Sequence, residues 1–205
     1  MTEHPLAPPN FEVMITADEI RKRVRELGAQ ISADYRGEEV VLVGVLKGCI
    51  LFMADLAREI HLPLTMDFLR LASYEGEKST GMVRFDFDMT QSIHGKHVLI
   101  VEDIVDTGLT MTYLLETLRV RQPKSLKLCT LLDKPSGRRK HVDVHYTGFR
   151  IPGRFVIGYG LDLEGRHRNL PHIAALDARV QAALRVQAAE SQRLKAQAVD
   201  LPRGA

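Results

Sequence analysis

The chain has 205 residues, 45% of them hydrophobic, and a formal net charge of +2, which suits one domain with a sizeable core. Near-neutral charge argues against a dedicated nucleic-acid binder, because such a protein needs a concentrated basic face. No apolar stretch approaches the ~20 residues of a membrane-spanning helix, and Cys49 and Cys129 lie in apolar runs typical of buried free thiols.

The first ten residues, Met1 to Asn10, are polar and contain prolines, which favours a loose start over a secretory signal. A cytoplasmic, reducing setting is expected. Thr16 and Glu19 have the spacing of a helix-capping box, and apolar residues from Ile20 to Ile31 then fall on one helical face. The pattern predicts a scaffold helix.

The next segment predicts a strand, a turn and a helix. Val40 to Leu46 is an apolar run, as in a strand buried on both faces of a parallel sheet. Lys47-Gly48 and a helical segment from Ile50 to about Ile60 follow. Such corners carry sites at the carboxyl edge of open α/β sheets.

Two strands joined by a polar loop are expected after this helix. Leu62 to Tyr74 is typical of a strand, and Val83 to Met89 alternates apolar with charged residues, as in a strand with one wet face. Between them, Ser73 to Gly81 is polar and lacks a periodic signal. We expect an exposed, mobile flap over about residues 73–82.

The stretch VLIVEDIVDTGLTMT, which begins at Val98, carries the strongest functional signal. Its first four residues predict another strand buried on both faces. Glu102 and Asp103 follow at once, and Asp106 opens a tight Asp-Thr-Gly turn. Ionised carboxylates only accept hydrogen bonds and attract hard cations, so these acids suit sugar hydroxyls and a magnesium ion.

The second half of this stretch suits phosphate. Thr110 is placed to cap a helix that begins at Met111 and runs to about Arg121. Hydroxyls, a glycine and free N–H groups at a helix N-terminus bind phosphate well. The stretch therefore indicates a site for a phosphorylated sugar. On these residues alone, an ordinary strand–helix connection or part of another nucleotide-binding sheet stays open.

Three further strands are predicted, at Leu126–Leu132, Val142–Tyr146 and Phe155–Leu161. Asp133-Lys134-Pro135 ends the first of them, and the basic run from Gly137 to Lys140 is interpreted as a solvated loop. Strands that alternate with helices or crossovers predict an α/β sheet.

From Ala174 onward, Ala, Arg, Gln and Glu dominate, and the pattern predicts a terminal helix with a frayed end. Leu176, Val180 and Leu184 form a short apolar stripe that could dock on the domain or on a second subunit. The simpler interpretation is a loosely held helix without a catalytic part.

The order of these motifs along the chain resembles that of the type I phosphoribosyltransferases, in the form carried by the 6-oxopurine (hypoxanthine-guanine) enzymes. The stretch from Val98 is similar to their diphosphosugar-binding motif. Further matching segments are Leu46-Lys47-Gly48, Asp67 to Arg70 with Ser73-Tyr74, Asp133-Lys134, Phe155 to Tyr159, Leu161-Asp162 and Arg168 to Pro171.

The resemblance extends from about residue 11 to 173. It implies an α/β, type I phosphoribosyltransferase fold, with a central parallel sheet flanked by helices and a small hood and flap region. One domain is expected over residues 1–176, followed by a helical tail of unassigned role at 177–205.

Several residues match the family's sugar-phosphate site. Glu102 and Asp103 match two acids that, in the family, hold the ribose hydroxyls of phosphoribosyl diphosphate. Thr107, Gly108 and Thr110 match the loop that cradles the 5′-phosphate. One continuous stretch is thus expected to bind the sugar phosphate.

Others match the family's base site. Asp106 matches the proposed general base near purine N7, and Lys134 matches the lysine that bonds the 6-oxo group and so selects against adenine. Phe155 resembles the aromatic residue that stacks on the purine, and Val156 the backbone contact for its edge. Asp162 matches an acid of the same site that is linked to magnesium.

Lys47 and Gly48 match the family's diphosphate loop, which contains a non-proline cis peptide, and Arg168 matches a further diphosphate contact. Ser73 and Tyr74 match the flap, which would close over the site and exclude water. Mg2+ is the implied cofactor, with Glu102, Asp103 and Asp162 as its ligands.

The implied reaction transfers ribosyl 5-phosphate from phosphoribosyl diphosphate to N9 of hypoxanthine or guanine, giving IMP or GMP and diphosphate. A homodimer or homotetramer is expected from the resemblance, with no nucleic-acid or membrane partner. Small departures from the family pattern occur at Gly160 and His167, and neither carries an assigned role.

Three alternatives compete with this interpretation. A regulator on the same fold would sense the diphosphosugar while it binds RNA or DNA, but it needs a basic face or an added domain and does not require Asp106 or Lys134. An enzyme for another base, such as xanthine or a pyrimidine, is disfavoured by the lysine with its downstream Phe-Val and Leu-Asp segments. A non-catalytic nucleotide-binding domain would release no diphosphate.

Overall fold

The computed structural model describes residues 10–73, 83–177 and 179–180. The elements in chain order are β1 (Phe11–Ile15), α1 (Ala17–Asp34), β2 (Val40–Val45), α2 (Ile50–Glu59), β3 (Leu64–Ser73), β4 (Val83–Phe87), β5 (His97–Val105), α3 (Leu109–Arg119), β6 (Ser125–Asp133), the 3-10 helix η1 (Pro135–Gly137), β7 (Tyr146–Arg150), β8 (Val156–Ile157) and β9 (Ile173–Leu176). Within the described ranges, no helix is long and apolar enough to cross a lipid bilayer.

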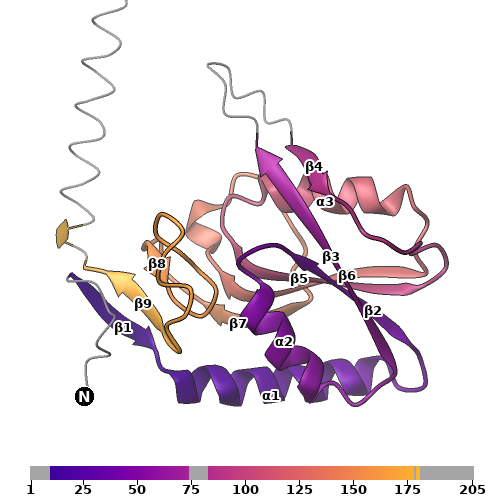
Figure 1. Cartoon of the computed structure of the whole chain (residues 1–205), viewed down its shortest axis with the longest axis horizontal. Helices are drawn as coiled ribbons and strands as arrows, with labels where there is room; N and C mark the ends of the chain where they lie inside the picture. Colours follow the sequence, from indigo (N-terminus) through magenta and orange to yellow (C-terminus); the bar gives the residue numbers. More distant parts are fainter. Residues whose placement is uncertain (1–9, 74–82, 178, 181–205) are drawn as a thin grey trace, which may run out of the picture.

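Six strands form the central sheet in the order β4-β3-β2-β5-β6-β7 (Figure 1). Neighbouring strands pair in parallel except β3 and β4, which are antiparallel. β5 lies between β2 and β6, so the carboxyl ends of these three strands lie at one edge of the sheet. The predicted central parallel sheet is confirmed.

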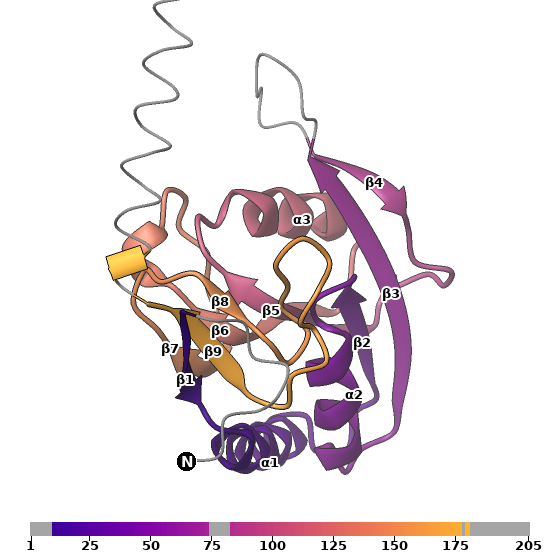
Figure 2. The ribbon, with the colours of Figure 1, turned by 60° about the vertical axis from the view of Figure 1, so that its left-hand side comes forward.

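The sheet is apolar on both faces, because successive residues of a strand point to opposite sides. On one face, Leu42, Leu99 and Leu131 belong to the core that includes the buried side chains of α1 and α2. On the other face, Val43 and Ile100 pack with the buried side chains of α3. Figure 2 shows α1 and α2 on one side of the sheet and α3 on the other.

The start of α1 is as predicted. The Thr16 hydroxyl accepts a hydrogen bond from the Glu19 N–H at 3.3 Å, and the Glu19 carboxylate accepts one from the Thr16 N–H at 2.8 Å. Two backbone donors at the helix end are thereby satisfied, as in a complete capping box.

A second sheet has the order β1-β9-β8 and is antiparallel. Its strand β1 follows directly on the segment expected to be a loose start. β9 covers Ile173–Leu176, so the predicted helix does not begin at Ala174. Residues 179–180 are helical, and the rest of the predicted tail helix lies outside the described residues. In β9, pairing with β1 on one side and β8 on the other outweighs the helix propensity of its alanines. Leu176 thus belongs to a strand, and Leu184 lies outside the described residues.

Two more predictions of strands need correction. β7 covers Tyr146–Arg150 rather than Val142–Tyr146. The segment before it is irregular, and the buried Val142 side chain packs in the core beside α3, which explains the apolar alternation without a strand. β8 covers Val156–Ile157 rather than the whole run to Leu161, because the chain turns at Gly158, where φ is 96°.

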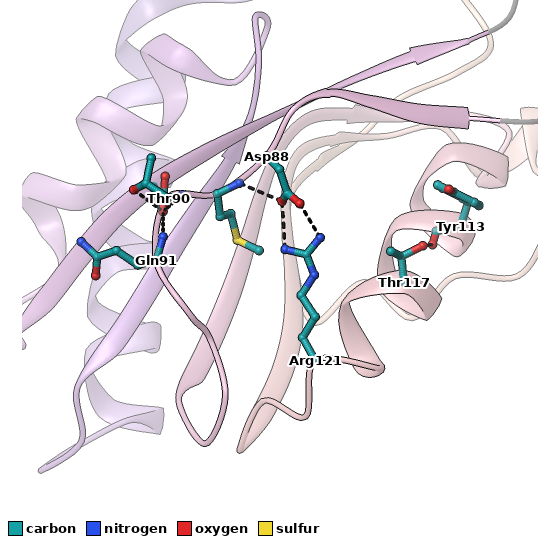
Figure 3. A network of polar contacts seen from close by, with 8 residues as sticks. Asp88, Thr90, Gln91, Tyr113, Thr117 and Arg121 are labelled. Carbon is teal, nitrogen blue, oxygen red and sulfur yellow. Dashed lines mark hydrogen bonds and ion pairs between the residues drawn. The ribbon is translucent and has the colours of Figure 1, made fainter.

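Polar contacts fasten the end of β4 to its neighbours (Figure 3). The Asp88 carboxylate accepts two hydrogen bonds from the Arg121 guanidinium, at 2.9 and 2.6 Å, and this pairing lowers the pKa of Asp88. The buried Asp67 carboxylate on β3 accepts hydrogen bonds from the N–H groups of Thr90 at 2.8 Å and Gln91 at 3.2 Å. The segment after β4 is thereby tied both to β3 and to the end of α3.

Candidate active site

Segments at the carboxyl ends of neighbouring parallel strands form the site. β5 continues to Val105, so Glu102 and Asp103 belong to the strand itself rather than to the turn after it. The Lys134 N–H donates to the Val105 carbonyl at 2.9 Å, which extends the pairing of β5 and β6 as far as the lysine. The acids of β5 and the lysine after β6 therefore meet at one edge of the sheet.

Asp106 and Lys134 form an ion pair on the wall of a cavity of about 540 Å³. The Lys134 ammonium donates to Asp106 Oδ2 at 3.0 Å, and the two side chains are 12% and 45% exposed. The cavity is lined by Asp106, Lys134, Ser136, Gly137, Gly153, Arg154 and Phe155. An ammonium, a carboxylate and an aromatic ring around one cavity suit a flat, polar heterocycle.

A second cavity, of about 140 Å³, lies at the start of α3. It is lined by Glu102, Ile104, Val105, Asp106, Thr107, Gly108, Thr110 and Met111. α3 begins at Leu109 with Gly108 as its N-cap, at a φ of 80° that favours glycine. The prediction that Thr110 caps a helix from Met111 is therefore wrong. Thr110 lies in the first turn, and the Thr107 hydroxyl accepts a hydrogen bond from the Leu109 N–H at 3.4 Å.

The predicted phosphate loop nevertheless surrounds this second cavity. Thr107, Gly108 and Thr110 all contribute to its wall, together with the first residues of α3. A helix N-terminus with a left-handed glycine and two hydroxyl side chains is an environment that binds phosphate.

A third group of predicted residues packs around Asp103. A Cβ on Gly48 would lie 1.6 Å from Asp103 Oδ2, so the Gly48 backbone is in contact with this carboxylate. A Cβ on Gly160 would lie 2.0 Å from the Gly48 carbonyl oxygen. Arg168 donates to the Gly160 carbonyl at 2.5 Å and pairs with Asp162 Oδ1 at 2.6 Å. The predicted diphosphate loop at Gly48 and the segment from Gly160 to Arg168 thus lie together beside Asp103.

The other predicted residues are placed as follows. The peptide between Leu46 and Lys47 is cis, as the resemblance implies. Val156 is buried on β8 and is not among the residues that line the two cavities. Ser73 ends β3, and Tyr74 lies outside the described residues, so the flap stays a prediction.

The two acids of β5 are partly buried and have few hydrogen-bond donors around them. Burial raises the pKa of Glu102 well above its usual range, the charge of Asp103 adds to this shift, and Glu102 Oε2 has no hydrogen-bond partner among the described residues. Burial also raises the pKa of Asp103 to about 6, although the Ile104 N–H at 2.8 Å and the nearby Arg168 oppose the shift. Buried acids of this kind favour a cation or sugar hydroxyls as ligands.

Within the described part of the chain, no group of three or more His, Cys, Asp or Glu side chains is arranged to hold a metal ion. Mg2+ commonly binds through one or two carboxylates and completes its shell with water and substrate oxygens. The acidic pair fits that mode of binding.

The basic run from Gly137 to Lys140 is only partly a solvated loop. A Cβ on Gly137 would lie 2.0 Å from Asp106 Oδ1, so its backbone is in contact with this carboxylate. Arg138 forms an ion pair with the buried Asp133. The larger cavity is also lined by three residues that no sequence pattern singles out: Ser136, Gly137 and Arg154.

An open parallel sheet, an acidic pair, a phosphate-type loop and a cavity for a flat base together define an α/β enzyme that handles a sugar phosphate and a heterocyclic base. Residues 15–164 match the family model of the phosphoribosyl transferase domain. The chain belongs to the type I phosphoribosyltransferase family.

Known relatives carry more specific names. The hypoxanthine-guanine phosphoribosyltransferase of Mycobacterium avium is 47% identical over 175 residues, which cover 82% of this chain and 86% of the relative. That of Bacillus subtilis (strain 168) is 46% identical over 166 residues, which cover 80% and 92%. The structure of hypoxanthine phosphoribosyltransferase from Trypanosoma cruzi, in complex with the product IMP, superposes with a TM-score of 0.80 at 43% identity and covers 86% of this chain and 100% of that one.

Proposed function

We infer that this chain is a purine-salvage enzyme that transfers ribosyl 5-phosphate from phosphoribosyl diphosphate to N9 of hypoxanthine or guanine. The single observation that carries the inference is the Asp106–Lys134 pair beside Phe155 on one cavity wall. These three groups match the N7–H, the 6-oxo group and the flat face of a 6-oxopurine. Relatives named for this activity are 46% and 47% identical to the chain.

The sugar phosphate binds along β5 and the start of α3. Glu102 and Asp103 accept hydrogen bonds from the ribose hydroxyls. The buried Oε2 atom of Glu102, which has no hydrogen-bond partner in the described part of the chain, supports this assignment. Thr107, Gly108 and Thr110 hold the 5′-phosphate, supported by their place around the cavity at the helix N-terminus.

The base lies in the larger cavity. The Lys134 ammonium donates to the 6-oxo group, and adenine is rejected because its exocyclic amine cannot accept this bond. Phe155 stacks on the purine. The roles at the purine edge that the resemblance implies for Val156 and Asp162 stay predictions, because neither residue is among those that line this cavity. As the bond between N9 and C1′ forms, Asp106 accepts the N7 proton, and its contact with Lys134 at 3.0 Å holds the carboxylate on the wall of the same cavity.

Negative charge builds on the diphosphate as its bond to C1′ breaks. Lys47, Gly48 and Arg168 bind this leaving group, and the two cationic side chains stabilise its charge. Mg2+ would be held by Glu102 and Asp103, with water and substrate oxygens completing its shell. Asp162, which the resemblance implies as a third ligand, pairs instead with Arg168 and forms no three-carboxylate group with them among the described residues. When bound, Mg2+ neutralises charge on the diphosphate oxygens. The burial of the acidic pair and the raised pKa values support a cation at this place.

We further propose a homodimer or homotetramer in the cytoplasm. Exposed apolar side chains at the start of α2 (Ile50, Leu51) and on β3 (Met66) support association, which light scattering would measure. The two cysteines are free and buried, which suits a reducing setting.

A steady-state assay with Mg2+ and phosphoribosyl diphosphate, offering hypoxanthine, guanine, xanthine, adenine and uracil in turn, tests the function. Turnover of hypoxanthine or guanine without turnover of adenine is the expected result. Turnover confined to xanthine or uracil would assign another base. If the protein binds phosphoribosyl diphosphate but turns over none of the bases, the result would favour a sensor of the diphosphosugar over an enzyme.

A further inference from the structure

The second sheet, whose strands β1, β9 and β8 are seen in Figure 2, contacts Arg154 and Phe155. Both of these residues line the larger cavity. The Leu176 N–H of β9 donates to the Phe155 carbonyl at 2.9 Å. The Arg154 guanidinium donates twice to the Leu176 carbonyl, at 2.5 and 3.2 Å. Two consecutive wall residues are therefore held by the last residue of one strand.

β1 adds a direct contact with the ring. Phe11 is paired in register with Leu176, and its ring meets the Phe155 ring edge to face, with centroids 6.5 Å apart and planes at 67°. The next residue, Glu12, pairs with Arg154 at 2.5 Å. Both residues at the start of β1 thus contact the two wall residues.

The orientation of the Phe155 ring depends on each single contact more than the orientation of a fully buried aromatic ring does. Phe155 is 40% exposed, so fewer neighbours surround its ring than surround a fully buried side chain. Edge-to-face aromatic pairs favour defined ring geometries beyond the area that they bury. The contact with Phe11 therefore selects the plane that Phe155 presents to the cavity.

We propose that Phe11 is a positioning residue for the purine, which fixes the plane of the Phe155 ring on which the base stacks. This inference rests on the proposed stacking role of Phe155. Phe11 is not among the residues that line the cavity, so it acts through Phe155 rather than by contact with the base.

Phe11→Leu tests the proposal, because leucine keeps apolar bulk on β1 and removes the ring. We expect the KM for hypoxanthine and the Kd for IMP to rise about three- to tenfold, the range that corresponds to loss of one aromatic pair. The KM for phosphoribosyl diphosphate and kcat should stay within about twofold. Phe11→Tyr, which keeps the ring, should restore the wild-type constants.

Val13→Ala is the matched control for a general weakening of β1. Val13 lies on the same strand, pairs with Ala174 of β9 and is 47% exposed. The Val13→Ala substitution should leave the KM for hypoxanthine unchanged. A rise in this KM equal to that of Phe11→Leu would overturn the positioning role, and Phe11→Ile repeats the test with a side chain that favours strands.

A double-substitution cycle separates this inference from the proposed function on which it rests. Phe155→Leu alone should raise the KM for hypoxanthine, and an unchanged value would overturn the stacking role itself. In the Phe155→Leu background, Phe11→Leu should change the KM by less than about 1.5-fold, because the ring that it orients is absent. Additive effects, or an unchanged KM in folded Phe11→Leu protein, would overturn the role of Phe11 alone.

Discussion

The acidic pair of β5 and Asp106, which follows the same strand, lie in different environments. Glu102 and Asp103 are partly buried, and desolvation raises the pKa of both carboxyls. Asp106 is 45% exposed and forms an ion pair with Lys134 at 3.0 Å. Arg168 only partly offsets the desolvation of the acidic pair, whereas Asp106 is in direct contact with a lysine.

This difference shows how one strand end can serve both binding and proton transfer. Burial makes the charged form of the acidic pair unfavourable until a cation or hydroxyl groups arrive. Asp106 has the Lys134 ammonium 3.0 Å from its carboxylate before any ligand binds. Substitutions in the two regions should therefore fail in different ways, the first in ligand binding and the second in turnover.

Asp106→Asn should have the largest effect. Asparagine keeps the shape of the side chain but cannot accept the N7 proton, and a general base typically contributes about 10²- to 10⁴-fold to the rate. We expect kcat to fall by about this factor while the Kd for phosphoribosyl diphosphate changes little. Steady-state kinetics and a donor titration measure the two quantities, and an unchanged kcat would contradict the assignment of the base.

Asp103 should make the stability of the ligand-free protein depend on pH. Its pKa is about 6 in the folded chain and 3.8 as the ordinary value. Between these values the folded state binds more protons than the unfolded state, so the free energy of unfolding falls as pH rises from about 4 to 6 and is level above. A shift of about two units corresponds to about 3 kcal/mol.

Urea unfolding of the wild type and of Asp103→Asn between pH 4 and pH 7.5 measures this dependence. The variant should gain stability relative to the wild type as pH rises through the window and keep that gain above it. A difference between the two proteins that does not vary with pH would show that Asp103 is not the titrating group.

The central sheet could be predicted because its causes are local. The aliphatic runs that begin at Val40 and Val98 are strands in any setting that buries both faces, and the capping box of Thr16 and Glu19 acts within one turn. β9 is different, because its alanines favour a helix locally. It becomes a strand through pairing with β1 from the other end of the chain and with β8.

The candidate site divides in the same way. The acids could be identified because they stand in one ordered motif at the end of a strand, whereas Lys134 is singled out through the family resemblance. Gly137 belongs to a run that is locally an ordinary basic turn, and its contact with Asp106 exists because β5 and β6 end side by side. The ion pair of Arg138 with buried Asp133 has the same origin, since it depends on how the turn after β6 folds back.

Gly137→Ala should lower turnover in the same manner as Asp106→Asn, but by less. The new Cβ would lie 2.0 Å from Asp106 Oδ1, so the carboxylate must move away from its 3.0 Å contact with Lys134 and from the proton that it accepts. Displacement of a reacting group by about 1 Å costs up to about 10²-fold in rate. We expect kcat to fall about ten- to a hundredfold with little change in the KM for phosphoribosyl diphosphate.

Gly153→Ala is the matched control, because it adds a methyl group to the wall of the same cavity. The nearest neighbour of its Cβ would be Ser136 Oγ at 3.3 Å, a hydroxyl that can rotate aside, so a clearly smaller loss of kcat is expected. Thermal unfolding of both variants checks that the fold is kept. Equal losses would mean that filling the cavity lowers turnover, whereas a loss confined to Gly137→Ala assigns the effect to the position of the Asp106 carboxylate.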